Sequence, residues 1–318
     1  MLSVSRRDLI QPFRLALRPL VEPGQRYAVG VSGGPDSMAL LDLAHRAAPS
    51  LDIDLAVAHL DHGWRVRSSE DAALVERAAA ARGQRFIGGR LEGVRPSEGE
   101  GRAARLAFFR EVASSVLLGH SADDQSETVI THLLRGAGTL RGMRSIEDVD
   151  GLRLLRPLLG FRRAELREYC QSHGVPFVDD ASNRDPAFLR NRVRHELLPL
   201  LEALAPGASG RLARLAEVAR ADLDVVDAAV DAVWRDVVDE QLAIDRPRFR
   251  ALPEGVQRGV LRRVAIELLG PAPDLSFERL EAVRRALIGG RGGAVVEWPS
   301  GARLELERRR GIFRRYPT

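Results

Sequence analysis

The segment that decides the expected fold is Val29-Gly30-Val31-Ser32-Gly33-Gly34-Pro35-Asp36-Ser37-Met38-Ala39-Leu40-Leu41. A short apolar strand, Tyr27 to Val31, leads into a glycine-rich turn, and apolar residues at helical spacing follow the turn. Paired glycines let backbone N–H groups approach an anion, and a helix start adds N–H donors and the positive end of its dipole. The segment therefore predicts a phosphate-binding loop.

Two features of this loop restrict the phosphate ligand. The loop lacks the Gly-Lys-Ser/Thr ending of a Walker A site, and the chain contains no lysine at all. Asp36 lies inside the turn, where an acid close to phosphates is favourable mainly with a bridging Mg²⁺. An ordinary glycine turn capped by Ser32 or Asp36 is the alternative, but the flanking strand and helix favour the phosphate site. The loop resembles the Ser-Gly-Gly-x-Asp-Ser loop of ATP pyrophosphatases, which implies cleavage of ATP at its α-phosphate.

Composition is that of a globular protein with room for two domains. The chain has 318 residues, a net charge of +4, 45% hydrophobic and 29% charged residues. Its single cysteine, Cys170, excludes a disulfide framework, a cysteine zinc site and an iron–sulfur cluster, which favours a cytoplasmic location. No apolar run is long enough for a membrane span. All 48 basic residues are arginines, which alone is weak evidence for nucleic-acid binding.

Further apolar strands predict an α/β fold around this loop. Candidates are Leu51–Leu60, Arg85–Gly88, Ser115–Gly119 and Leu152–Leu159, and residues 136–151 read as a glycine-rich loop. Continuous apolar character is typical of strands buried on both faces. We therefore expect a parallel, doubly wound sheet of about five strands, of the adenine nucleotide α-hydrolase-like type.

Polar residues follow two of these strands, at the sheet edge where such folds bind ligands. His59, Asp61 and His62 end one strand, and their spacing favours lining of the nucleotide pocket over a metal site. Gly119 and His120 end another, and Asp123, Asp124 and Glu127 come directly after them. Asp124 and Glu127 are three residues apart at a helix start, so their carboxylates share a face that can bind a cation or an ammonium group. Helix capping explains one of these acids without a ligand.

Arginines recur at three further places. Arg102 and Arg105 lie almost one turn apart on a predicted helix, where they either share a phosphate or carboxylate or remain on the surface. A second group beside Asn183 is suited to phosphate contacts or to a solvated helix face; it comprises Arg184, Arg190, Asn191, Arg192 and Arg194. The third group, Arg308, Arg309 and Arg310, either contacts RNA or is a charged strand edge.

The C-terminal part predicts a second, smaller domain. Pro206-Gly207-Ala208-Ser209-Gly210 is typical of a boundary, and Leu212 to Val237 keep the apolar spacing of one long amphipathic helix. Two further helices and a β-hairpin over Ala294–Glu307 follow. The expected domains are residues 1–207, which carry the ATP site, and residues 208–318, which are mostly helical and end in the hairpin.

The order of motifs resembles the tRNA(Ile)-lysidine synthetase family from about residue 24 to 200. The motifs are Ser32 to Ser37, Asp61-His62-Gly63, Gly119-His120, Ala122-Asp123-Asp124-Gln125, Glu127-Thr128, Arg156-Pro157-Leu158-Leu159, Ser182-Asn183 and Leu189-Arg190-Asn191-Arg192-Val193-Arg194. The helical region and hairpin after residue 210 resemble the tRNA-recognition domain of the family, which implies that residues 208–318 recognise tRNA. The chain departs from the family pattern at Ser121, Leu106 and Ala181.

This resemblance implies a reaction and its partners. ATP would adenylate C2 of the wobble cytidine in the CAU anticodon of isoleucine tRNA, and free L-lysine would then displace AMP. ATP and Mg²⁺ would be held by a set comprising Ser32, Gly33, Gly34, Pro35, Asp36, Ser37, His59, Asp61, His62, Gly119 and His120. Asp123, Asp124 and Glu127 would bind lysine, with Arg102 and Arg105 near the activated intermediate; a homodimer is left open.

Three other functions are less consistent with the sequence. A cytidine thiolase would need several cysteines for its cluster, and a glutamine-dependent ATP pyrophosphatase would need an ammonia-producing domain. A non-catalytic tRNA-binding module is disfavoured by the retention of Asp36, Asp124 and Glu127.

Overall fold

The computed structural model describes residues 8–61, 68–91, 98–136, 142–178, 189–270 and 275–315. Internal contacts divide the chain into two units, one of residues 1–128 and 143–213 and the other of residues 129–142 and 214–318. The division falls inside two helices, α5 (Ala122–Leu134) and α9 (Ala208–Val237).

The first unit is built on a six-stranded sheet with the order β3-β2-β1-β4-β6-β5. All neighbouring pairs are parallel except β5 with β6. The strands are β1 (Arg26–Gly30), β2 (Asp54–Asp61), β3 (Arg85–Arg90), β4 (Ser115–Leu118), β5 (Ile146–Val149) and β6 (Leu152–Leu155). The predicted parallel sheet is confirmed. The loop predicted over 136–151 is wrong in part, because β5 adds an antiparallel edge strand there.

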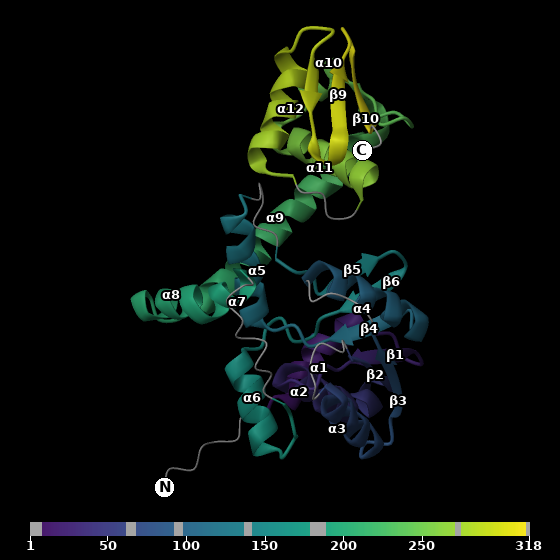
Figure 1. The fold of residues 1–318 in the computed structure, drawn as a ribbon, viewed down its shortest axis with the longest axis vertical. Helices are drawn as coiled ribbons and strands as arrows, with labels where there is room; N and C mark the ends of the chain where they lie inside the picture. The colour runs from purple at the N-terminus through teal and green to yellow at the C-terminus, as the bar shows by residue number, and fades with distance from the viewer. Residues whose placement is uncertain are drawn as a thin grey trace. The chain divides into compact units, whose positions relative to one another are not determined.

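Helices cover both faces of this sheet, as expected of a doubly wound fold (Figure 1). One core packs α1, α2, α3 and α6 against β1 and β2, and a smaller core packs α4 on the opposite face. The helices of this unit are α1 (Ile10–Leu17), α2 (Pro35–Leu51), α3 (Ser68–Ala80), α4 (Glu98–Val112), α6 (Arg163–Ser172), α7 (Leu189–Arg192) and α8 (Leu198–Leu204). A short 3₁₀ turn (Arg18–Leu20) follows α1, and a π-helical turn (Val193–Leu197) joins α7 to α8.

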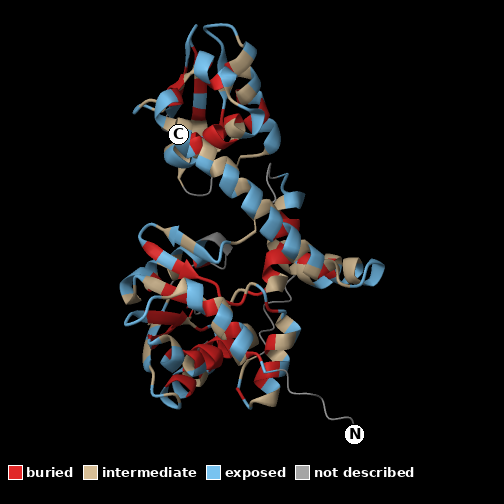
Figure 2. Ribbon diagram, turned by 180° about the vertical axis from the view of Figure 1, so that it is seen from behind, coloured by how far each residue is buried: buried red, intermediate tan, exposed pale blue. Residues whose placement is uncertain are grey.

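Alternation along β1 explains how one strand serves both cores. Tyr27 and Val29 face the α2 side, whereas Ala28 faces α4 and packs with Phe109. Gly30 continues the α4 face, and a Cβ there would lie 2.9 Å from the Phe109 ring. The small residues of β1 therefore let α4 approach the centre of the sheet closely. Figure 2 shows buried residues both on strands and on the helices.

The second unit has its own antiparallel sheet, ordered β7-β10-β9-β8. Its elements are β7 (Ile244–Asp245), α10 (Arg246–Ala251), α11 (Glu254–Leu269), α12 (Phe277–Gly289), β8 (Val295–Glu297), β9 (Ala302–Leu306) and β10 (Arg310–Arg315), with a 3₁₀ turn at Pro299–Gly301. The predicted hairpin is confirmed as β8 paired with β9, and α9 confirms the long helix. The core joins Leu304 and Phe313 of the sheet, together with Trp298 directly after β8, to the apolar faces of α11 and α12.

In the described part of the chain, no helix is long and apolar enough to cross a membrane.

Candidate active site

The loop Ser32–Ser37 joins β1 to α2 at the carboxyl edge of the parallel sheet. Gly33 has φ +92°, a left-handed conformation that favours glycine, and Gly34 is the N-cap of α2, with Pro35 at the first helical position. The Ser37 hydroxyl accepts a hydrogen bond from the Ser32 backbone N–H (3.1 Å) and donates one to the Gly34 carbonyl (2.9 Å). The loop is therefore preorganised around the first turn of α2, whose N–H groups can receive a phosphate.

Gly119, which follows β4, completes this cradle from the neighbouring strand. A Cβ on Gly119 would lie 3.1 Å from both the Cα and the backbone nitrogen of Ser37. Only a glycine lets the two segments approach so closely. The structure therefore brings Gly119 against the predicted phosphate loop.

Asp36 lies at the start of α2 with one oxygen paired and one unpaired. Its Oδ2 accepts a hydrogen bond from Arg163 Nε at 3.1 Å, whereas its Oδ1 is buried without a hydrogen-bond partner in the described residues. Burial, opposed by Arg163, raises the pKa of Asp36 to about 6. A buried carboxylate oxygen without a partner is the kind of atom that a cation would satisfy.

Asp124 and Glu127 of α5 lie in the same cluster as Asp36, and three arginines hold them. Arg163, the first residue of α6, donates to Asp124 Oδ1 at 2.9 Å and to Glu127 Oε1 at 3.1 Å. Arg190 Nε donates to Glu127 Oε2 at 2.9 Å, and Arg194 Nε donates to Glu127 Oε1 at 2.7 Å. Asp124 and Glu127 thus share their arginine partners, and in this structure guanidinium groups occupy the face where a cation or ammonium group is predicted.

The electrostatics of this cluster favour ionised acids. Burial raises the pKa of Asp124 and of Glu127, but the arginines outweigh burial and leave both pKa values below their usual range. Asp124 Oδ2 also accepts from the backbone N–H and the hydroxyl of Ser121, each at 2.8 Å. One oxygen of Asp124 therefore caps the start of α5, as the capping interpretation predicts. Its other oxygen accepts hydrogen bonds from the arginines.

Asp123 contacts the backbone at the start of α6. Its Oδ2 accepts the backbone N–H of Arg163 at 2.7 Å, so it holds the first turn of α6. A direct contact between Asp123 and an amine, as proposed by analogy with the family, would compete with this bond.

His120 lies beside a buried arginine. Arg156, 2% exposed, donates from Nε to His120 Nδ1 at 3.1 Å and forms an ion pair with Glu147 of β5 at 2.5 Å. Burial, with the charges of Arg156 and Arg105, lowers the pKa of His120 to about 3. The imidazole is therefore neutral and accepts from Arg156, which leaves its other ring nitrogen protonated.

Arg102 and Arg105 lie on α4. The charge of Arg105 helps to lower the pKa of His120, and that of Arg102 helps to lower the pKa of Arg156. Arg102 is exposed and Arg105 is partly buried. Both arginines therefore act electrostatically on the His120 side of the site.

The structure describes two of the three predicted site residues at the end of β2, His59 and Asp61. His59 is buried, and its Nδ1 donates to the Val31 carbonyl at 2.7 Å, directly before the phosphate loop. Its Nε2 is buried with no partner in the described residues, so an acceptor is available there. Asp61 is buried and faces Arg90 at 3.8 Å, whereas His62 lies outside the described residues.

The residues predicted to bind tRNA separate into two groups. Arg190 and Arg194 point into the acid cluster, while Arg192 forms an exposed ion pair with Glu196 at 3.2 Å, and Arg184 lies outside the described residues. Asn191 lies on α7 between them. In the second unit, Arg308 and Arg309 are exposed between β9 and β10, and Arg310 pairs with Asp239 at 2.8 Å.

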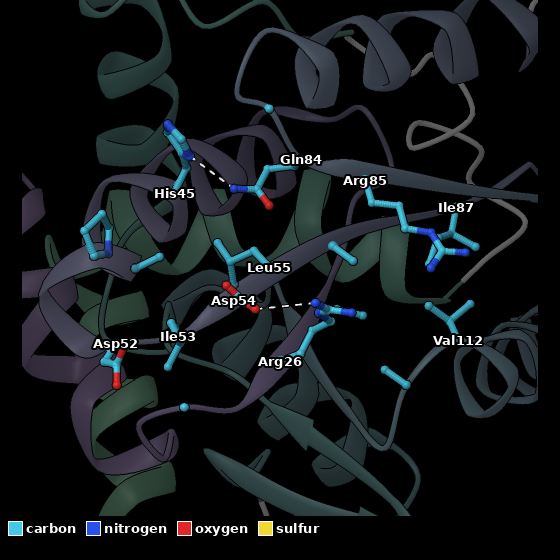
Figure 3. Close-up of a pocket in the computed structure, with 17 residues that line it drawn as sticks. Arg26, His45, Asp52, Ile53, Asp54, Leu55, Gln84, Arg85, Ile87 and Val112 are labelled. Atoms are coloured by element: carbon cyan, nitrogen blue, oxygen red, sulfur yellow. Dashed lines mark hydrogen bonds and ion pairs between the residues drawn. The ribbon is translucent and has the colours of Figure 1, made fainter.

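A cavity of about 740 Å³ lies at the opposite edge of the same sheet (Figure 3). Arg26, Asp54 and Arg85, which begin β1, β2 and β3, line it, and His45 of α2 faces Gln84 across it. Arg26 and Asp54 neutralise each other at 3.4 Å and are mostly exposed. The phosphate loop and the acid cluster are at the carboxyl ends of the strands, so this cavity is not the candidate active site.

Sequence reasoning missed Arg163. Its side chain contacts Asp36 across 127 positions of sequence, so no local pattern links the two residues. The one available signal is the position of Arg163 at a helix start after Gly160, a pattern too common to identify a site residue.

The fold and the site together define a PP-loop protein. A parallel sheet carries Ser-Gly-Gly-Pro-Asp-Ser between its central strand and the next helix, and the model of the PP-loop domain matches residues 6–201. The model of the TilS substrate binding domain matches residues 244–315. Together with the curated relatives, these matches show that the chain belongs to the tRNA(Ile)-lysidine synthase family.

Several curated relatives share this architecture over most of the chain. The tRNA(Ile)-lysidine synthase of Gloeobacter violaceus is 38% identical over 85% of this chain and 86% of its own length. That of Thermobifida fusca is 36% identical over 91% of each. That of Geobacter sulfurreducens is 38% identical over 93% of this chain, which spans only 65% of that longer relative.

Among solved structures, the U34-tRNA thiolase NcsA from Methanococcus maripaludis, described with its [4Fe-4S] cluster, has the same fold. Its TM-score is 0.55 at 15% identity, over 66% of this chain and 78% of that one. This likeness concerns the fold alone.

Proposed function

We propose that this protein ligates L-lysine to C2 of the wobble cytidine in the CAU anticodon of isoleucine tRNA, using ATP. The observation that carries the proposal is the meeting of Asp36, Asp124 and Glu127 beside the Ser32–Ser37 loop. The relatives that match most of the chain are tRNA(Ile)-lysidine synthases, which supports this reaction.

The phosphate loop and Asp36 would hold the nucleotide. Backbone N–H groups at the start of α2 would bind the pyrophosphate end of ATP, close to Gly119. The unpaired Oδ1 of Asp36 fits a Mg²⁺ ion, and no group of three or more metal-ligating side chains occurs in the described residues, so the remaining ligands would be phosphate oxygens and water. Bound Mg²⁺ would neutralise negative charge at the phosphates.

The acids and the arginines would act on different reactants in a reaction of two chemical steps. Attack of the cytidine O2 on the α-phosphate releases pyrophosphate and gives an adenylated tRNA; attack of the lysine ε-amine at C2 then breaks the C2–O bond and releases AMP. Asp124 and Glu127 would orient the ammonium group of lysine, and Arg102 and Arg105 would stabilise the adenylated base. Exposed Arg192, Arg308 and Arg309 are the candidates for tRNA phosphates.

Thiolation of a tRNA base is the alternative reaction on this fold. An iron–sulfur cluster is usually held by four cysteine thiolates. This chain has only Cys170, which is buried and lies 3.4 Å from the Pro35 carbonyl, and burial raises its pKa to about 12. A neutral buried thiol is a poor ligand and a poor nucleophile, which favours ligation of an amine.

Incorporation of labelled lysine into an isoleucine tRNA transcript with a CAU anticodon, with ATP and Mg²⁺, tests the proposal. The wild-type protein should label this transcript and release AMP, and a transcript with a CAC anticodon should stay unlabelled. Folded protein that incorporates no lysine would refute the proposed function.

The variant Asp36→Asn tests the role of the loop acid. It should abolish AMP formation and leave tRNA binding nearly unchanged, because it keeps the shape but removes the charge. Asp54→Asn, an exposed acid at the opposite sheet edge, is the matched control and should retain activity. Equal loss of tRNA binding and AMP formation in Asp36→Asn would mean that Asp36 is structural.

A further inference from the structure

Arg163 connects the nucleotide loop to the two acids of α5. Its Nε contacts Asp36 at 3.1 Å, its Nη2 contacts Asp124 at 2.9 Å, and its Nη1 contacts Glu127 at 3.1 Å. All three nitrogens of one planar guanidinium group are thus used on three different carboxylates. Arg163 is the arginine of the cluster that the structure shows in contact with Asp36.

The base of this side chain is held firmly. The backbone N–H of Arg163 donates to Asp123 at 2.7 Å, and Tyr169 further along α6 donates to buried Asp42 of α2 at 2.6 Å. Motion of Arg163 is therefore expected in the side chain, about a fixed Cα, while α6 stays packed on α2.

The charges of the cluster balance without any ligand. Asp36, Asp124 and Glu127 carry three negative charges, and Arg163, Arg190 and Arg194 carry three positive charges. Asp124 Oδ1 accepts hydrogen bonds from all three arginines, and both oxygens of Glu127 accept from arginines as well. An ammonium group that enters this cluster gains little unless a guanidinium group leaves it.

We propose that Arg163 is a positioning residue that couples nucleotide binding to lysine binding. When the nucleotide and its Mg²⁺ engage Asp36, Arg163 turns from the acids to a phosphate oxygen. Asp124 and Glu127 keep their contacts with Arg190 and Arg194 but lose one positive charge, which the ammonium group replaces. Phosphate is a strong bidentate partner of guanidinium, so the exchange replaces one set of charge-assisted hydrogen bonds by another. This inference rests on the proposed function, because it takes lysine as the amine.

Equilibrium dialysis of labelled L-lysine tests the coupling. Binding is measured with and without Mg²⁺ and an ATP analogue that resists cleavage between its α- and β-phosphates. The wild-type protein should bind lysine about tenfold more tightly with the analogue, a factor typical of coupled sites. Arg163→Gln should bind lysine without the analogue about as tightly as the wild type does with it, and its coupling should fall below about twofold.

Arg162→Gln is the matched control, since Arg162 precedes Arg163, is mostly exposed and faces Glu202 at 3.8 Å. It should keep the wild-type coupling. Circular dichroism checks the fold, and Arg163→Lys, which keeps the charge but cannot bridge three acids, should show reduced coupling if Arg163→Gln does not fold.

Full coupling in folded Arg163→Gln, or a wild-type lysine affinity that the analogue leaves unchanged, would overturn the inference while leaving the proposed function intact. Absence of lysine binding to the wild type even with the analogue would instead refute the proposed function, and the inference with it.

Discussion

Replacement of His120 by glutamine should change how the protein responds to acid. The His120 pKa is about 3 in the folded protein against 6.5 for an ordinary histidine, because the ring is enclosed beside Arg156. Below pH 6.5 the unfolded chain binds a proton that the folded chain rejects. The stabilising contribution of neutral His120 is therefore complete above the unfolded pKa and is lost as the pH falls toward the folded pKa.

The magnitude follows from this difference in pKa. From the unfolded pKa down to about pH 4, protonation of His120 lowers the free energy of the unfolded state by about 1.36 kcal/mol for each pH unit. The total is about 3 kcal/mol. His120 is only partly buried as a residue, and residual solvent screening reduces the expected effect to about 2 kcal/mol. The glutamine amide oxygen can still accept from Arg156, but it does not titrate.

Urea unfolding of both proteins at a series of pH values from about 8 to about 4 measures the effect. The free energy of unfolding of the wild type should fall by about 2 kcal/mol more than that of His120→Gln across this range. A constant difference between the two proteins at every pH would refute the conclusion that His120 is held neutral by its surroundings.

Three more predictions concern the loop, the core and the second unit. Gly119→Ala should weaken ATP binding about tenfold or more by displacing Ser37, whereas Gly160→Ala, which has open space, should leave the affinity unchanged; a fluorescent ATP analogue measures both. Tyr169→Phe should lower the free energy of unfolding by about 2 kcal/mol, because the buried carboxylate of Asp42 loses a 2.6 Å donor; a variant as stable as wild type in urea would contradict this. Arg308→Ser with Arg309→Ser should weaken tRNA binding and reduce the slope of log affinity against log salt concentration by about one to two, the value for one or two lost phosphate contacts. Filter binding at several salt concentrations measures this slope, and an unchanged slope would exclude both residues from the RNA surface.

Point substitutions at Arg308 and Arg309 are preferable to removal of the tail, because residues 295–315 contribute to the core of the second unit. Trp298, Leu304 and Phe313 of this segment belong to the buried core of the second unit. Removal of the whole tail would expose that core, so a loss of tRNA binding could not be assigned to charge.

Local sequence patterns were enough to predict the central fold. The apolar runs of β1, β2 and β4 are continuous, and the glycine-rich loop has a distinctive order of residues, so both strands and loop were found. β5 was missed because Ile146-Glu147-Asp148-Val149 has only four residues and two acids. Such a strand forms through its pairing with β6, which a local pattern does not reveal.

The candidate site was predictable for its acids and unpredictable for their partners. Asp124 and Glu127 share a face because they are three residues apart on one helix, and that spacing is visible in the sequence. Their contacts with Arg163, Arg190 and Arg194 depend on how three other segments return to the sheet edge. The sequence pattern therefore places Arg190 and Arg194 on an RNA-binding surface, whereas in the structure their side chains contact the acids.

The division of the chain inside α5 and α9 has a consequence for protein synthesis. Residues 129–142, which belong with the second unit, leave the ribosome before residues 143–213, which complete the first. The first sheet cannot gain β6 until those later residues emerge, and residues 129–142 must wait longer still for the rest of their own unit. Nascent chains that end near residue 142 should therefore be the ones that depend most on chaperones.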